Sequence, residues 1–111
     1  MIVFNLIVFS KDQIDDIVNC ILNNKFALQV VVIDALDSYH LDSQNLKIHS
    51  PVYNIQFVTK SLLFKEIEST LNKEFPGTNF QLFANLILHI NAPLYDNIIN
   101  LVTGVSTKDK D

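Results

Sequence analysis

Arginine is absent from this 111-residue sequence, and eight lysines stand against twelve acidic residues, for a net charge of −4. Nucleic-acid binding depends on basic groups that neutralise phosphates, and arginine supplies the planar fork that phosphate sites favour. The sequence therefore predicts a protein without a nucleic-acid partner.

Cysteine and long apolar runs are also scarce. Cys20 is the only cysteine, so the chain forms no internal disulfide and we expect a reducing, cytoplasmic compartment. No apolar run approaches the roughly 18 residues of a membrane-spanning helix, so we expect no membrane span. Apolar residues still make up 49% of the chain, which indicates one globular domain over residues 1–105. The polar tail over 106–111 is expected to be disordered.

Apolar periodicity predicts four strands and three helices. Residues 2–9 are apolar on both faces, as in a central strand, and Ser10 with Gln13 forms a capping box before a helix over 11–23. A change of apolar phase near Ser50-Pro51 predicts a bulge or kink in the third strand. The other elements are expected as a strand over 26–33 that runs on towards Tyr39, a strand over 46–59, a helix capped by Thr59 or Ser61 and ending at Phe75, a strand over 80–90, and a helix between Asn91 and Gly104.

This order of elements predicts the α+β class and a ferredoxin-like βαββαβ arrangement with a C-terminal helix. Two βαβ halves with right-handed crossovers give a four-stranded antiparallel sheet with two helices on one face. On the other face, Phe83 and Ile87 of the fourth strand alternate with Gln81, Asn85 and His89. A solvent-facing sheet surface should be mainly polar. We therefore expect Phe83, Ile87 and His89 at a subunit interface.

Histidine and aspartate residues gather around the polar turn between the second and third strands. Two imidazoles and a carboxylate can hold a divalent metal such as copper or zinc, which makes His40, His49 and Asp42 candidate ligands. The alternative is a solvated acidic hairpin, because the ligand spacing fits no known metal motif.

Elsewhere the sequence gives no catalytic signal. Cys20 flanks the apolar stripe of the first helix without a nearby base or cation, which indicates packing as a small apolar group. His89 has no identifiable partner with which to act as a base. We therefore expect no catalytic residue, and a small-molecule hydrolase stays a third hypothesis that requires a pocket with a perturbed acid or base.

Several short stretches match a known family in type and spacing. Residues 25–30 stand where that family has a stretch like Arg-Leu-Ala-Ala-Cys-Val, Val58-Thr59 stands on its Lys-Thr pair, and Pro76 stands on the proline of its His-Pro-Tyr turn. Tyr39 matches its hairpin tyrosine, and Asn91 and Tyr95 match its closing helix. Over about residues 2–101 the chain thus resembles the CutA family of divalent-cation tolerance proteins, relatives of the PII-type signalling proteins.

The resemblance implies a cytoplasmic homotrimer that binds or regulates, with ligand sites between subunits and no enzymatic activity. The family's metal-binding cysteine, its turn histidine and its strand glutamate fall on Gln29, Phe75 and Gln81, which bind divalent metals poorly. No cofactor is therefore expected, and copper or zinc at a relocated His40/His49 site is the alternative. RNA recognition on the same fold is disfavoured, because Tyr53–Val58 lacks the basic residue and both glycines of that motif.

Overall fold

The four strands and three α-helices follow one another in the expected order. The computed structural model describes residues 1–104, apart from the side chain of Ala35, and the expected tail over 106–111 lies outside the described residues. The elements are β1 (Ile2–Val8), α1 (Ile14–Asn23), β2 (Val31–Leu41), β3 (Lys47–Thr59), α2 (Phe64–Glu74), β4 (Gln81–Leu86) and α3 (Ala92–Leu101).

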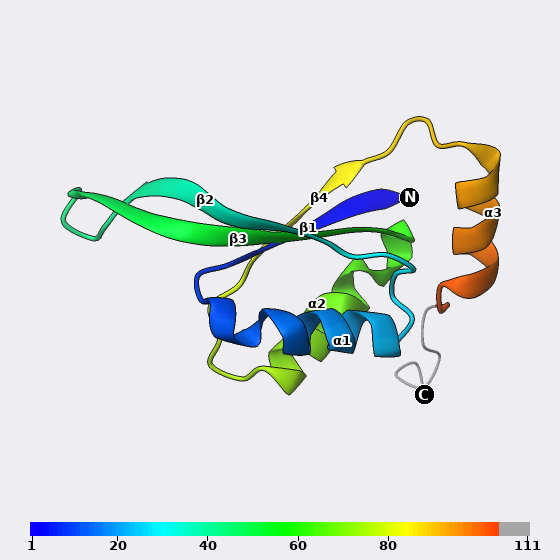
Figure 1. Cartoon of the computed structure of the whole chain (residues 1–111), viewed down its shortest axis with the longest axis horizontal. Helices are drawn as coiled ribbons and strands as arrows, with labels where there is room; N and C mark the ends of the chain where they lie inside the picture. Colours follow the sequence, from blue (N-terminus) through cyan, green and yellow to red (C-terminus); the bar gives the residue numbers. More distant parts are fainter. Residues whose placement is uncertain (105–111) are drawn as a thin grey trace.

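The strands form one antiparallel sheet in the order β2-β3-β1-β4. Helices α1 and α2 lie side by side against one face of this sheet, while α3 stands apart at one end of it (Figure 1). At the other end, the β2–β3 hairpin projects past both helices (Figure 1). This is the α+β, ferredoxin-like arrangement that the sequence predicts.

The core lies between β1 and the two covering helices. Phe4 and Leu6 of β1 are fully buried, as are Ile17 of α1 and Ile67 of α2. The Phe4 ring stacks on Phe57 of β3, with the ring centres 4.8 Å apart. The helical spacing of the apolar residues in α1 and α2 places them on the face that meets the sheet.

The second strand begins later than expected, at Val31 rather than at Phe26. Lys25 adopts a left-handed backbone conformation with φ 56°, and the Phe26 N–H donates to the Ile21 carbonyl. These contacts close the end of α1, and Phe26 and Ala27 are buried as part of a turn. The apolar character of Phe26 and Ala27 therefore reflects core packing and not strand pairing.

Strand β4 covers the six residues Gln81–Leu86. It is therefore shorter than the strand of eleven residues expected over 80–90. Its partner in the sheet is β1, and the last bond between the two segments runs from the Ile87 N–H to the Met1 carbonyl at 3.2 Å. The register between β1 and β4 ends at the pair Ile2–Leu86. Leu88 is 80% exposed.

The bulge lies in β2 and not near Ser50-Pro51 of β3. Ile33 pairs with Asn54 and Leu36 with Val52, so two residues of β2 stand opposite Tyr53. Strand β3 itself contains no extra residue, but residues 47–52 extend past β1 and pair only with β2. The alternation of apolar residues changes there because this part of β3 lies beyond the helices that cover the sheet (Figure 1).

The residues expected to cap the second helix act otherwise. The Ser61 hydroxyl accepts a bond from the N-terminal ammonium, and the Thr59 hydroxyl donates to the Phe26 carbonyl at 2.6 Å. Thr59 is fully buried, so this bond ties the end of β3 to the turn after α1.

We expect Thr59→Val to lower the free energy of unfolding by about 1–3 kcal/mol, because it leaves the Phe26 carbonyl buried without its donor. Urea unfolding at fixed protein concentration measures the change. Thr70→Val in α2 is the matched control and is expected to stay within about 0.5 kcal/mol of the wild type. Equal losses in both variants would contradict the assignment.

Candidate functional site

The sheet face that α1 and α2 leave uncovered, which we call the open face, is mixed in character. The strand registers place two kinds of side chain on it. Its apolar members are Val3 and Ile7 of β1, Val31 and Ile33 of β2, Val58 of β3 and Phe83 of β4. Its amides are Asn5 of β1, Asn54 and Gln56 of β3, and Gln81 and Asn85 of β4.

Four of these amides form a hydrogen-bonded cluster around Asn5. The Asn5 amide group donates to Asn85 Oδ1 at 2.9 Å and to the Val3 carbonyl at 3.3 Å. Its oxygen accepts from Gln56 Nε2 at 2.9 Å and from Asn54 Nδ2 at 3.4 Å. Asn5 is only 3% exposed, so the cluster satisfies a polar group that lies buried in the middle of the sheet.

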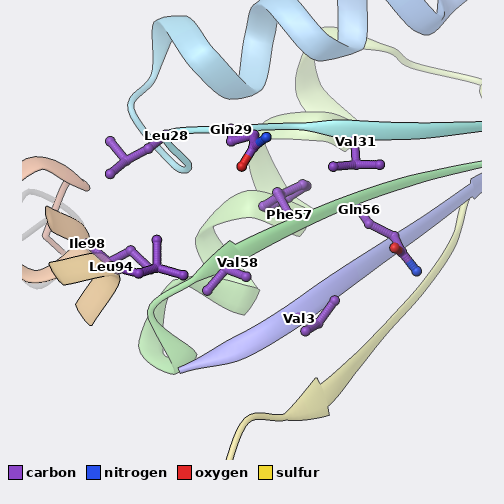
Figure 2. Close-up of a pocket in the computed structure, with 9 residues that line it drawn as sticks. All are labelled: Val3, Leu28, Gln29, Val31, Gln56, Phe57, Val58, Leu94 and Ile98. Atoms are coloured by element: carbon purple, nitrogen blue, oxygen red, sulfur yellow. The ribbon is translucent and has the colours of Figure 1, made fainter. Parts of the chain in front are cut away.

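Next to this amide cluster, a pocket of about 260 Å³ lies between the open face and α3 (Figure 2). Four segments build its walls: the residues just before and at the start of β2, the start of β1, the end of β3 beside it, and α3. The lining residues are Val3, Leu28, Gln29, Val31, Gln56, Phe57, Val58, Leu94 and Ile98.

The electrostatics of this pocket are simple. None of its nine lining residues carries a charge or titrates near neutral pH. The two polar members are Gln29 and Gln56, and the bond to Asn5 fixes the Gln56 side chain. The pocket is therefore suited to holding a neutral group and not to acid–base chemistry.

Helix α3 forms one wall of the pocket and has few other contacts. Asn91 caps its start, and Ile98 and Val102 are buried against the rest of the chain. Lys60 Nζ donates to the Val102 carbonyl at 2.8 Å, which anchors the end of the helix. The remaining large apolar side chains of α3 are 40–57% exposed, namely Leu94, Tyr95, Ile99 and Leu101.

The three candidate metal ligands do not converge within one chain. His49 Nε2 lies 2.9 Å from Asp37 Oδ1, and the His49 ring stacks on Tyr39. Successive strand residues point to opposite faces, so His40, which follows Tyr39, lies on the other side of the hairpin. Asp42 Oδ1 instead accepts the backbone N–H groups of Gln44 and Leu46. Within residues 1–104, no group of three or more such side chains is placed to hold a metal ion.

The three expected interface residues lie near the free edge of the sheet. Phe83 is on the open face opposite Asn5 and is 48% exposed. Ile87 and His89 come after β4 has ended, half-buried and exposed respectively. Of the three, Phe83 alone sits within the paired sheet.

The positions that the CutA resemblance marks as ligand sites lie far apart in one chain. Gln29 lines the pocket near Val3, whereas Gln81 pairs with Ile7 at the other end of β1, and Phe75 packs edge-on against Phe80 before β4 begins. Ile7 is four steps along the strand from Val3, which corresponds to about 13 Å.

Cys20 behaves as the sequence predicts for a packed thiol. Partial burial raises its pKa, the nearby Glu74 carboxylate raises it further, and the bond from Asn24 Nδ2 opposes the rise. A raised pKa keeps the sulfur in the unreactive thiol form.

Sequence reasoning missed the pocket, because it assigned residues 26–30 to a strand. Leu28 and Gln29 lie instead in the connection before β2 and form part of the pocket wall. Left-handed Lys25 is what diverts the chain, and a lysine there gives no signal in the sequence.

Comparison with known proteins identifies the fold. No family model and no curated protein matches the sequence. No helix in residues 1–104 is long and apolar enough to cross a membrane.

Solved structures do match the fold. The periplasmic divalent cation tolerance protein CutA from Archaeoglobus fulgidus and the divalent cation tolerance protein from Thermus thermophilus are each 17% identical, over 93% of this chain and all of theirs, with TM-scores of 0.80. CutA1 from Oryza sativa is 14% identical over 94% of both chains, with a TM-score of 0.83. The chain therefore has the fold of the CutA divalent cation tolerance proteins.

Proposed function

We propose that the chain is a divergent CutA protein that forms a homotrimer, and that it binds a ligand between subunits without catalysing a reaction. The shared fold and the scattered residue matches support the family. The single cysteine supports a reducing compartment such as the cytoplasm. The resemblance to a family related to the PII-type signalling proteins supports a role in signalling.

The observation that best supports an assembly is the apolar surface that stays exposed to solvent in a single chain. On the open face Phe83 is 48% exposed, and α3 adds Ile99 at 46% and Leu101 at 57%. A phenylalanine buries about 200 Å² when covered, so covering the exposed half of Phe83 is worth about 2.5 kcal/mol. The simplest cover is a second copy of the chain, and the CutA fold supports the number three.

The positions of the family's ligand residues support sites between subunits. Gln29 and Gln81 lie near opposite ends of β1 in one chain. They can contribute to one site only when two copies bring opposite ends of their sheets together.

The chemistry of the pocket supports binding over catalysis. General acid–base or nucleophilic catalysis needs a titratable group or an activated nucleophile at the reacting atom. The pocket offers two carboxamides and apolar side chains instead.

We expect the wild-type protein to elute as one species of about 38 kDa, three times 12.6 kDa, when size exclusion is coupled to light scattering. Phe83→Asp should shift the mass to 12.6 kDa, because an interface cannot bury an unpaired carboxylate without a large loss of free energy. Circular dichroism shows whether the variant keeps its secondary structure.

Leu22→Asp is the matched control, since Leu22 is 39% exposed on α1, in the helix layer that the proposed assembly leaves outside. The control should keep the trimer mass. A folded wild-type monomer at micromolar concentration would contradict the assembly, and a trimeric Phe83→Asp variant would contradict this interface.

The second candidate function is binding of a divalent metal, which the names of the similar structures favour. The candidate ligands His40, His49 and Asp42 face different directions on one hairpin. A metal there would have to be shared between hairpins of neighbouring copies.

We expect no stoichiometric binding of Cu²⁺ or Zn²⁺ in micromolar calorimetric titrations, because Gln29 and Gln81 replace ligands that bind these ions well. Gln29→Ala and Gln81→Ala should leave the weak heat signal unchanged. Stoichiometric binding that His40→Ala abolishes and His89→Ala preserves would instead establish the second candidate.

A further inference from the structure

We propose that the pocket between the open face and α3 binds a small, uncharged, mainly apolar molecule that carries a carboxamide-like group. The inference rests on the proposed binding role and adds the chemical class of the ligand.

The size of the pocket limits the ligand. A volume of about 260 Å³ lies just below the range of pockets that hold drug-sized molecules. One ring with a short polar substituent fills this space, whereas most of a nucleotide or of a peptide segment of several residues would lie outside it. The apolar walls formed by Val3, Val58 and Leu94 (Figure 2) suit the ring.

The charge of the walls selects a neutral ligand. Burying an ion without a partner costs far more free energy than the apolar contacts of a small ligand return. No lining residue carries a charge that could neutralise a carboxylate, a phosphate or an ammonium group. The net charge of −4 would attract cations to the surface as a whole, but the pocket itself gives them no counter-charge.

The polar rim selects the hydrogen-bonding group. Gln29 projects its carboxamide over the pocket from the segment before β2 (Figure 2). A carboxamide has donors and acceptors in one plane, so a second carboxamide can pair with it in both directions. Gln56, on the wall towards the amide cluster, is already fixed by its bond to Asn5 Oδ1 at 2.9 Å, which keeps that wall in place.

Three isosteric probes test the charge preference: neutral benzamide, anionic benzoate and cationic benzamidinium. Titrations followed by backbone amide NMR shifts of Val3, Val31 and Val58 report on this site directly. Benzamide should bind with a millimolar dissociation constant, as a fragment of nine non-hydrogen atoms does. Benzoate and benzamidinium should each bind at least about tenfold more weakly.

Two matched variants test the contact with Gln29. Gln29→Leu should weaken benzamide binding by about three- to tenfold, the effect of one lost hydrogen bond. Gln44→Leu makes the same change on the exposed turn between β2 and β3, outside the pocket, and should leave the affinity unchanged.

The outcomes separate this inference from the proposed assembly. The inference is wrong if no probe shifts the pocket resonances, if either ion binds as tightly as benzamide, or if Gln29→Leu behaves like Gln44→Leu. Light scattering on the same samples decides the assembly independently. A trimer that does not bind benzamide would contradict only the proposed ligand class. A monomer that binds benzamide would support the ligand class and contradict the proposed trimer.

Discussion

Two helices can cover only one face of a four-stranded sheet, and the rest of this structure depends on how the other face is treated. On the helix side, β1 buries Phe4 and Leu6 completely. On the open side the same strand presents Val3, Asn5 and Ile7, a pattern neither polar enough for water nor apolar enough for a conventional core. Such a surface is stable only when its polar groups are paired and its apolar groups are covered.

The amide cluster meets the first of these conditions within one chain. Asn5 has two donors and two acceptor positions, and four hydrogen bonds use them. The partners come from both neighbouring strands, so the cluster also ties β3 and β4 to β1. Asn54 Oδ1 is the buried atom of the cluster left without a partner among the described residues. An unsatisfied acceptor of this kind weakens the cluster, which limits how much stability the polar centre of the sheet can provide.

The sequence predicts those features that depend on a residue's near neighbours, and it misses those that depend on distant partners. Apolar spacing correctly located α1 through Ile17 and Ile21, and the order of elements correctly predicted the ferredoxin-like fold. The predicted end of β4 was wrong because the length of β4 depends on its register with β1, and the predicted site of the bulge was wrong because the irregularity lies in β2, opposite β3. The pocket was missed for the same reason, since its walls come from four separate segments of the chain.

The uncharged walls of the pocket and the residue that replaces the CutA family's metal-binding cysteine both favour neutral polar groups over metal ions. Gln29 stands where the resemblance places a metal-binding cysteine, and the structure puts it on the rim of a pocket with uncharged walls. Replacing a thiolate with a carboxamide removes a soft metal ligand and leaves a planar group that recognises neutral donors and acceptors. Because α3 forms one wall of this pocket while most of its own apolar residues stay exposed, covering α3 and shaping the pocket are coupled. A neighbouring subunit that packed on α3 would therefore also fix the shape of the pocket.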